Sequence, residues 1–399
     1  MKVVHLNTNL NITSAPYHLH RALLAKGIES RLLIFNECDI EGAESPKHDP
    51  AYKIRRHTVA LKRESVMEKF TPDLYLPFSA LPMGIDVSRH PFIEESDVIC
   101  IHWVSGDYLS PKEIEQLLMT GKKVLIFCHD NCHFTGGCHV RLGCNKYKSG
   151  CGSCPQLCSF DREDISASLA KEKYDKYSKY LNYMVISPST WMDNNVSQSF
   201  VFKDKPHKVL HNAIDTDTFR PYDRAVVRKL FDLPVDKKVV LTAFKANEKI
   251  PYNGAKYLWE VLEKLDPNIY VAMFGVDEIS SEHSAGIHNL GFISDRDKLA
   301  KLYSASDVYF TTSLEDSFNQ TVAECLACGT PVAAFENGGI ADLIEHQKNG
   351  YLAEYKNSED LVKGIEFLLD SDKKFSTRKK ILSKFSYEAI ADEFIKMVE

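Results

Sequence analysis

Four cysteines in the first half of the chain have a spacing that metal sites use. They are Cys138, Cys144, Cys151 and Cys154, in the pattern C-x5-C-x6-C-x2-C. Four thiolates in tetrahedral geometry make a closed structural zinc site, and the last pair has zinc-knuckle spacing. The loop is rich in glycine and polar residues, so a bound metal would supply ordering energy that it lacks. We expect a structural zinc, in which His139 or His133 can replace one thiolate. The alternative is a loop of reduced thiols ordered by packing alone.

A second candidate site is the segment 313–332, SLEDSFNQTVAECLACGTPV. The pattern predicts a polar turn after a strand, then a helix that starts near Phe318 with Ser317 as its N-cap. Free N–H groups at a helix start attract anions, so a diphosphate is the expected ligand. Glu324, about two turns into the helix, can accept hydrogen bonds from ribose hydroxyls. Asp316, just before the helix, can accept hydrogen bonds from the hydroxyls of a sugar.

Length and composition restrict the class of protein. The chain has 399 residues, which favours two domains. A formal charge of −6 and a pI near 6.2 argue against a dedicated nucleic-acid binder. No apolar run approaches the roughly 20 residues of a membrane span, and the N-terminus lacks the features of a signal peptide. We therefore expect a cytoplasmic protein, in which thiols stay reduced and a disulfide knot is excluded.

Two series of short β-rich runs alternate with helical patterns, such as those over 17–26, 255–265 and 295–305. The first series comprises Lys2–Leu6, Arg31–Phe35, Asp97–His102, Lys123–Phe127, Tyr183–Ser187 and His207–His211. The second comprises Lys238–Ala243, Ile269–Phe274, Asp307–Thr312 and Pro331–Ala334. Alternation of this kind predicts an α/β protein with parallel sheets, here two Rossmann-like lobes that face a central cleft.

The expected domain boundaries follow from these two series. Residues 1–205 form the first lobe, which includes the cysteine-rich loop 128–158. Residues 206–375 form the second lobe, and 376–399 form a terminal helix that packs back towards the first lobe. The Asn-, Asp- and Pro-containing run 211–221 has loop chemistry and is the expected crossover. Ligands of open α/β sheets bind outside the carboxyl ends of the strands, which places the site in the cleft.

The segment around Asp316 and Glu324 resembles the E-x7-E region of family 4 retaining glycosyltransferases, which have the two-lobed GT-B fold. The resemblance covers most of residues 183–370. Other matching parts are Asn212 to Phe219, Gly291 to Ile293, Leu299 to Val308, Gly329 to Val332 and Gly338-Gly339. The block from Phe134 to Leu157 resembles a subgroup of these enzymes that builds bacterial surface polysaccharides.

The resemblance implies a role for each matching residue. Glu324 would bind the nucleotide ribose and Asp316 the donor sugar. His129 matches a histidine that faces the donor sugar from the first lobe. The groups that would hold sugar, phosphate and base lie on the backbone of Phe318, Asn319, Gln320 and Thr321, beside Ser317, and on that of Phe292 and Ile293.

The sequence departs from the family pattern at three places. The first acidic position is Asp316 rather than Glu, and Glu315 is the alternative if the loop shifts. The basic dipeptide that normally ends in Lys-Gly is Asn253-Gly254, so Lys245 or Lys249 is expected to supply the charge for the diphosphate. The first loop, 9–16, has Ala and Pro where the family commonly has paired glycines.

The implied reaction transfers a sugar, with retention, from a UDP- or GDP-linked donor to a saccharide or lipid-linked saccharide acceptor. No Asp-x-Asp motif lies where a divalent cation would bridge the phosphates, so we expect metal-independent catalysis and no cofactor beyond the structural zinc. Alternatives are a sugar-nucleotide epimerase, a phosphorylase, or a zinc-dependent binding module with a degenerate nucleotide site. The basic segment 53–69 is either a solvated helix face or a patch for an anionic acceptor or the inner face of the membrane.

Overall fold

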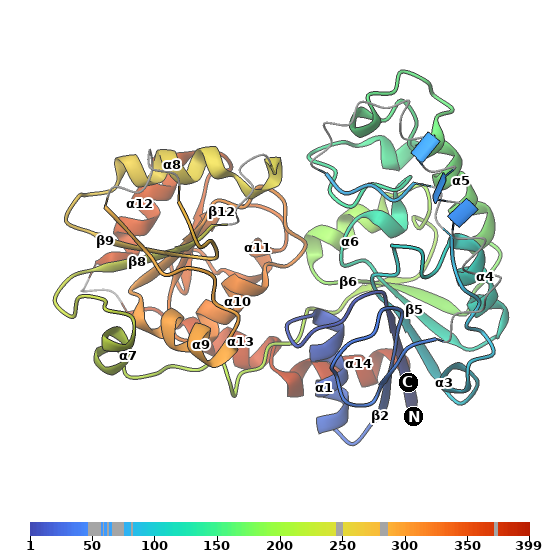
Figure 1. Ribbon diagram of the computed structural model, residues 1–399, viewed down its shortest axis with the longest axis horizontal. Helices are drawn as coiled ribbons and strands as arrows, with labels where there is room; N and C mark the ends of the chain where they lie inside the picture. The colour runs from blue at the N-terminus through green and yellow to red at the C-terminus, as the bar shows by residue number, and fades with distance from the viewer. Residues whose placement is uncertain are drawn as a thin grey trace. The chain divides into compact units, whose positions relative to one another are not determined.

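The computed structural model describes residues 1–46, 57–58, 60–61, 64–65, 76–80, 83–244, 250–279, 286–370 and 374–399. These residues form two compact units (Figure 1). Unit 1 comprises Met1–Asn212 together with Ile390–Glu399, and unit 2 comprises Ala213–Ala389. The six basic residues of segment 53–69 lie outside the described residues, as do Lys245 and Lys249.

Unit 1 contains a seven-stranded sheet with the order β3-β2-β1-β4-β5-β6-β7. Every neighbouring pair of strands is parallel. The strands are β1 (Lys2–Asn7), β2 (Glu29–Ile34), β3 (Ala43–Glu44), β4 (Val98–Ile101), β5 (Lys123–Phe127), β6 (Tyr183–Ser187) and β7 (His207–Val209).

Unit 2 contains a six-stranded sheet with the order β10-β9-β8-β11-β12-β13, again parallel throughout. The strands are β8 (Val239–Ala243), β9 (Tyr270–Phe274), β10 (Ile287–Asn289), β11 (Val308–Thr311), β12 (Val332–Phe335) and β13 (Gly350–Ala353).

Both sheets follow the Rossmann strand order 3-2-1-4-5-6 when strands are counted within each unit, with one further strand in unit 1. The order reverses between β1 and β4 in unit 1 and between β8 and β11 in unit 2. Ligands of such sheets bind outside the carboxyl ends of the strands at this reversal. The α/β class and the two Rossmann-like lobes predicted from the sequence are therefore confirmed.

Helices cover both faces of each sheet, as a fully parallel sheet requires. In unit 1 they are α1 (Ala15–Ala25), α3 (Pro91–Glu94), α4 (Pro111–Met119), α5 (Ile165–Tyr177) and α6 (Thr190–Ser197). In unit 2 they are α7 (Arg224–Leu230), α8 (Ala255–Lys264), α9 (Arg296–Ala305), α10 (Gln320–Ala327), α11 (Ile340–Leu343), α12 (Ser358–Leu369) and α13 (Thr377–Lys384). Within unit 2, α8 and α12 lie on one face of the sheet, and α9 and α10 lie on the other (Figure 1).

The core of unit 2 consists of two apolar clusters, one on each face of its sheet. Successive side chains of β8 alternate between them: Val239 and Leu241 belong to one cluster, and Val240 belongs to the other. All three are fully buried. This alternation is the period-2 geometry of a strand that is covered on both faces, and it holds the carboxyl ends of the strands in fixed positions.

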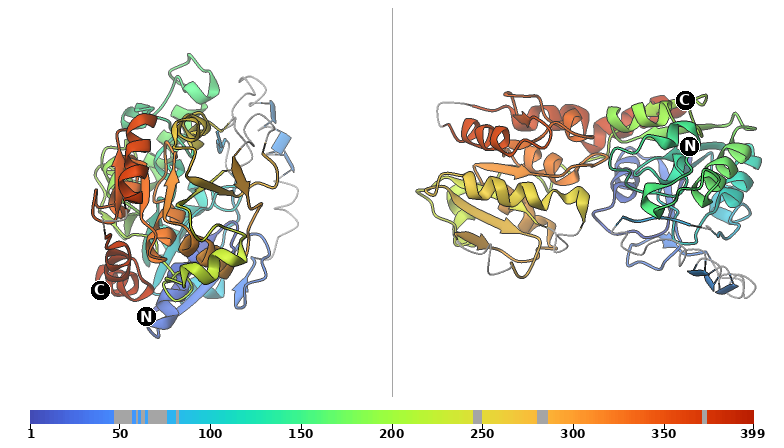
Figure 2. Two further views of the ribbon diagram at one scale, coloured as in Figure 1. Left: turned by 90° about the vertical axis from the view of Figure 1, so that its left-hand side faces the viewer. Right: turned by 90° about the horizontal axis from the view of Figure 1, so that it is seen from above.

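The last helix, α14 (Tyr387–Val398), carries the chain from unit 2 into unit 1. Its C-terminal part is tied to unit 1 by an ion pair of 2.7 Å between Lys26 and Asp392 and by a hydrogen bond from Lys123 to the Val398 carbonyl. Both termini consequently lie close together in unit 1 in every view (Figures 1 and 2). Among the described residues, no helix has the length and apolar character that crossing a bilayer requires.

Candidate functional site

The segment between β11 and α10 has a different helix start from the one predicted. α10 begins at Gln320, and its N-cap is Asn319, whose side chain accepts a hydrogen bond of 3.0 Å from the Val322 N–H. The prediction of Ser317 as N-cap and of a start near Phe318 is therefore wrong. Asn319 has φ 64°, a left-handed conformation that asparagine tolerates better than most residues.

Asp316 shapes the turn that precedes this helix. Its Oδ1 accepts hydrogen bonds from the N–H groups of Phe318, at 3.1 Å, and Asn319, at 2.7 Å. Two of the four amides predicted to face a diphosphate are therefore used within the turn. The N–H groups of Gln320 and Thr321 are in the first turn of the helix, where intrahelical partners do not exist. They are the donors available to a ligand at this position.

Glu324 is buried on α10, with 6% of its surface exposed. Its carboxylate lies 3.5 Å from the Tyr303 hydroxyl and 3.4 Å from Gln320 Nε2, which are long, weak hydrogen bonds. Burial raises the pKa of Glu324 to about 7, although nearby Arg296 acts to lower it. A buried carboxyl with weak partners and a raised pKa is typical of a functional site rather than of a structural ion pair.

Three residues in unit 2 carry buried donor atoms, four in all, for which no hydrogen-bond partner is found among the described residues. They are Asn253 Nδ2, Arg296 Nε and Nη2, and Asn337 Nδ2. Each lies in a loop or helix start that follows the carboxyl end of a strand. Arg296 keeps a 3.2 Å ion pair between its Nη1 and Asp215, and its Cζ lies 5.1 Å from the centre of the Phe219 ring. Because buried donors are almost always satisfied, these unpaired groups are candidates for hydrogen bonds to a polar ligand.

Three glycines lie so close to the backbone of segment 312–318 that a side chain at any of these three positions would collide with it. A Cβ at Gly254 would lie 1.9 Å from the Thr312 carbonyl oxygen. A Cβ at Gly338 would lie 2.2 Å from the Asp316 oxygen, and one at Gly339 would lie 2.3 Å from the Ser317 oxygen. The Gly339 N–H also donates to the Asp316 carbonyl at 2.9 Å. The loops that carry Asn253 and Asn337 are therefore packed against the loop that carries Asp316.

The predicted base-binding pair lies between β10 and α9. Phe292 is 68% exposed, whereas Ile293 is buried in the core. The Phe292 N–H already donates to Asp277 Oδ1 at 3.1 Å, so the exposed ring of Phe292, rather than its amide, is the group open to a ligand.

Three Asp-x-Asp tripeptides occur in the sequence of unit 2, at 215–217, 295–297 and 370–372, and the first two lie wholly within the described residues. Asp215 accepts from Thr218 and pairs with Arg296. Asp297 pairs with Lys301 and accepts from Tyr222. Among the described residues, no group of three or more His, Cys, Asp or Glu side chains is arranged to hold a metal ion.

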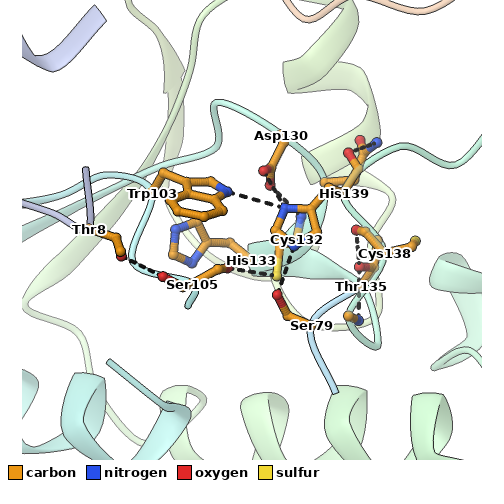
Figure 3. Close-up of polar contacts among 12 residues, drawn as sticks. Thr8, Ser79, Trp103, Ser105, Asp130, Cys132, His133, Thr135, Cys138 and His139 are labelled. Atoms are coloured by element: carbon orange, nitrogen blue, oxygen red, sulfur yellow. Dashed lines mark hydrogen bonds and ion pairs between the residues drawn. The ribbon is translucent and has the colours of Figure 1, made fainter. Parts of the chain in front are cut away.

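Unit 1 has a cavity of about 330 Å³ outside the carboxyl ends of β4 and β5. Its lining includes Trp103, Cys132, His133 and His139, which Figure 3 labels, and also Lys173. Aromatic and polar side chains both face this cavity, a combination typical of small-molecule sites.

His139 is fixed on both sides of its ring (Figure 3). Nδ1 lies 2.6 Å from the Asp130 carboxylate, and Nε2 lies 2.8 Å from the Ser79 hydroxyl. Burial lowers the pKa of His139, but the Cys132 sulfur and Asp130 raise it to about 10. Burial in turn raises the pKa of Cys132, and Lys173 and His139 lower it to about 7. The cavity wall therefore carries opposite charges close together.

His129, predicted to face a donor sugar, lies two residues after the end of β5. Its Nε2 lies 2.9 Å from Nδ1 of His102, a fully buried histidine that follows β4. The sequence analysis missed His102 and also His5 on β1. The available signal was a histidine inside or next to an apolar strand, which by itself does not distinguish a core residue from a functional one.

The four cysteines predicted to bind zinc line one small cavity, of about 20 Å³, in the 128–158 loop. A Gly136 N–H donates to Cys151 Sγ at 3.2 Å. Cys151, Gly152 and Ser153 have φ of 65°, 89° and 44°, a tight turn inside the C-x2-C pair. All eleven cysteines of the chain are described and all are free, so the expectation of reduced thiols agrees with the structure.

Each unit has a parallel sheet with the Rossmann strand order, and unit 2 has a buried acid behind the start of a helix. Together these features define the class of protein: the fold is that of the GT-B glycosyltransferases. Residues 228–385 match the family model for group 1 glycosyl transferases. This range contains Glu324, Arg296 and the other two unpaired donors. Residues 228–385 all belong to unit 2 and make up about two fifths of the chain, so the similarity to group 1 glycosyl transferases is found in this part.

Curated relatives match different shares of the chain. An uncharacterised glycosyltransferase of Methanocaldococcus jannaschii is 25% identical over 324 residues, 74% of this chain and 80% of that protein. The putative colanic acid biosynthesis glycosyl transferase WcaC of Escherichia coli is 22% identical, over 88% of this chain and 86% of that protein. A D-inositol 3-phosphate glycosyltransferase of Mycobacteroides abscessus is 30% identical, but the chain covers 45% of that protein.

Solved structures share the fold at low identity. Sucrose-phosphate synthase from Thermosynechococcus elongatus has a TM-score of 0.65 at 17% identity, covering 100% of this chain and 98% of that one. HepE of Anabaena, solved in complex with UDP-glucose, has a TM-score of 0.64 at 16% identity, covering 100% and 99%. Likeness at this identity supports the fold alone.

Proposed function

We propose that the protein is a retaining glycosyltransferase that moves a sugar from a UDP- or GDP-linked donor to a saccharide or lipid-linked saccharide acceptor, in the cytoplasm or at the inner face of the membrane. The observation that carries this proposal is the buried, weakly bonded Glu324 together with three residues that carry unpaired buried donors, all inside the range that matches the group 1 glycosyl transferases. Unpaired donors and a buried acid within one unit suit a ligand with both hydroxyl groups and anionic oxygens, as a nucleotide sugar has.

Each part of the donor has a matching group in unit 2. Glu324 accepts hydrogen bonds from the ribose hydroxyls, and the exposed ring of Phe292 lies beside the base. The diphosphate takes donors from Arg296, Asn253 and the helix-start amides of Gln320 and Thr321. Arg296 thus supplies charge that the sequence analysis assigned to Lys245 or Lys249.

The reaction proceeds with retention at the anomeric carbon through an oxocarbenium-like transition state. Negative charge grows on the departing diphosphate, and preorganised donors stabilise it without reorganising during the reaction. The departing phosphate accepts the proton of the acceptor hydroxyl as the new glycosidic bond forms. No second catalytic carboxylate is needed in this scheme, and no bound cation is needed because Arg296 supplies the charge.

The acceptor binds in the cavity of unit 1. Trp103 in its lining provides a ring on which a sugar can stack, and His139 and Lys173 provide donors for hydroxyl or acidic groups. WcaC is named for colanic acid biosynthesis, which favours a saccharide acceptor in surface polysaccharide synthesis. Zinc at Cys138, Cys144, Cys151 and Cys154 is proposed as a purely structural ion that orders the loop next to this cavity. The four thiols line one small cavity but, like the other His, Cys, Asp and Glu side chains of the described residues, are not arranged as a metal site, so the proposal requires them to move together around the ion.

A donor screen tests the proposal. The full-length protein is incubated with UDP- and GDP-hexoses, with and without an oligosaccharide acceptor, and free nucleotide, sugar products and linkage are analysed. Release of UDP or GDP that increases with acceptor, with an α-configured product from an α-configured donor, is the expected result. An altered sugar still joined to its nucleotide would identify an epimerase instead. Binding of nucleotide with no release under any condition would identify a binding module.

A further inference from the structure

A row of hydrogen-bonded histidines crosses three neighbouring strands of unit 1. His129 Nε2 lies 2.9 Å from His102 Nδ1, and His102 Nε2 lies 2.9 Å from His5 Nδ1. Beyond these, His5 Nε2 lies 3.1 Å from Ser30 Oγ, which lies 2.8 Å from His20 Nδ1. Five side chains from β1, β2, α1 and the ends of β4 and β5 therefore form one unbroken hydrogen-bonded chain.

The sheet register creates this row. His5 on β1 pairs with Cys100 on β4, and His102 lies two residues beyond Cys100. Ile101 pairs with Ile126 on β5, so His102 lies beside Phe127, and His129 lies two residues further on. Steps of two residues keep a side chain on the same face of a sheet. Each histidine therefore leans towards the next along a diagonal that ends at the carboxyl edge of the sheet.

Burial keeps these histidines neutral. His5 and His102 are fully buried, and His20 and Ser30 are each 8% exposed. Burial lowers the pKa of His102 and His5 well below the usual value, and it lowers the pKa of both His129 and His20 to about 4. The charged or titratable groups that face the chain are Asp130 and His133 at the His129 end and Arg21 at the His20 end.

The three directly bonded rings, His129, His102 and His5, can be filled in only two ways when neutral, because each ring has one N–H and one lone pair. In the first arrangement His129 donates to His102, His102 to His5, and His5 to Ser30. In the second arrangement each of these donors and acceptors is exchanged. Any mixture within the three rings would place two lone pairs or two N–H groups face to face. The Ser30 hydroxyl has two lone pairs and can accept from His5 whether His20 donates to it or accepts from it, so the bond between His102 and His5 determines whether His129 Nδ1 is an acceptor or a donor.

We propose that His102 and His5 are positioning residues that hold His129 neutral and fix which of its ring nitrogens carries the proton. The proposal rests on the proposed function, in which His129 faces the donor sugar. An imidazolium at that place would repel the positive charge that grows at the anomeric carbon, whereas a neutral ring of fixed tautomer offers a hydrogen bond without this repulsion. Partner groups commonly set the tautomer of a functional histidine in this way.

The first experiment detects the chain without any activity. In full-length protein labelled with ¹⁵N-histidine, N–H···N hydrogen bonds give scalar couplings between the two nitrogens. We expect two such couplings, His129–His102 and His102–His5, with one protonated nitrogen per ring and no change from pH 8 to 5.5. Absence of both couplings, or a ring that protonates near its usual pKa, would overturn the proposal. His207→Gln, at the other edge of the sheet and paired with Asp193, is the control that should leave the couplings intact.

The second experiment measures the role in catalysis. His5→Gln interrupts the row of hydrogen-bonded histidines two residues away from His129, and His102→Asn interrupts it next to His129. If one variant fails to fold, the other can still be measured. With the most rapidly hydrolysed UDP- or GDP-hexose of the donor panel, we expect kcat to fall about tenfold in either variant, with KM unchanged. If the wild type shows the couplings but kcat is the same in wild type and variants, His5 and His102 have no positioning role. If the wild type hydrolyses no donor, the proposed function is wrong, and the coupling measurement still shows whether the hydrogen-bonded row of histidines is present.

Discussion

Replacing Glu324 with glutamine should stabilise the protein and weaken its ligand binding at the same time. The pKa of this buried carboxyl is raised from 4.5 to about 7, chiefly by burial. A rise of that size corresponds to about 3 kcal/mol against the ionised form in the folded state. Glutamine has a similar shape and no charge, but it can satisfy only one of the two donors, Tyr303 and Gln320, at a cost of about 1 kcal/mol. The expected net gain in unfolding free energy at pH 8 is about 2 kcal/mol.

The pH dependence provides the sharper test. Because the folded pKa lies above the unfolded one, the folded state binds the extra proton between pH 4.5 and 7, and stability from this group falls as pH rises through that window. The advantage of Glu324→Gln should therefore be full at pH 8 and absent below pH 4.5. Urea unfolding followed by fluorescence of Trp259, the single tryptophan of unit 2, measures it. A variant less stable than wild type at pH 8, or a difference that does not vary with pH, would refute the reasoning.

Nucleotide binding should change in the opposite direction. The ionised carboxylate can accept hydrogen bonds from both ribose hydroxyls, and bonds to a charged group contribute about 1.5–3 kcal/mol each. Calorimetric titration of UDP and GDP at pH 8 should show affinity at least about tenfold lower in Glu324→Gln, with the two proteins converging as pH falls below 7. A matched substitution, Glu345→Gln, changes an exposed carboxyl two residues after α11, which is 4.0 Å from Lys380, and should alter neither property.

Three further predictions concern other residues. Arg296→Gln should lower the affinity for UDP or GDP about tenfold at low salt and reduce its salt dependence, as measured by calorimetry, and equal affinity would exclude the guanidinium from the phosphate site. Gly254→Ala should destabilise unit 2 by about 2–3 kcal/mol in urea unfolding, because it combines a positive φ with a backbone clash, whereas Gly27→Ala, with positive φ and open space, should cost about 1 kcal/mol. Elemental analysis should find about one zinc per chain, and glycosyl transfer should survive brief EDTA treatment; a strict Mg²⁺ or Mn²⁺ requirement would contradict metal-independent catalysis.

The sequence predicted the strands that are long and rich in apolar or β-branched residues. The predicted bounds of β5 and β6 agree with the structure residue for residue. The missed strands, β3, β10 and β13, have two to four residues and contain Gly, His, Asn or Glu. Such strands are held in place by their neighbours in the sheet rather than by their own propensity, so local pattern could not reveal them.

The start of α10 shows why the site was harder to predict than the fold. Ser317 and Asn319 are both good N-caps, and the choice depends on Asp316, whose side chain takes the Phe318 and Asn319 amides. The spacing of these residues in the sequence does not show which of the two side chains caps the helix. The contacts of Gly338 with the Asp316 backbone add a further long-range constraint on the same turn.

The histidine row illustrates a different limit. His5, His102 and His129 are far apart in the chain, and only the strand order β1-β4-β5 makes them neighbours. The sequence does predict a parallel sheet, but the strand order and the register that place one histidine diagonally beside the next come from the three-dimensional structure.

The two units use the same strand order for opposite electrostatic tasks. At the carboxyl edge of its sheet, unit 2 presents Arg296 and amide donors without partners, an arrangement that favours the negative charge of a departing diphosphate. At the equivalent edge, unit 1 presents His129, whose pKa burial lowers to about 4 and whose Nε2 lies 2.9 Å from His102 Nδ1. A reaction that separates an anionic leaving group from a cationic sugar requires both properties. If the proposed reaction tolerated a positive charge on His129 as well as it tolerates the charge on Arg296, the chemistry would give no reason for three buried histidines to lie behind His129.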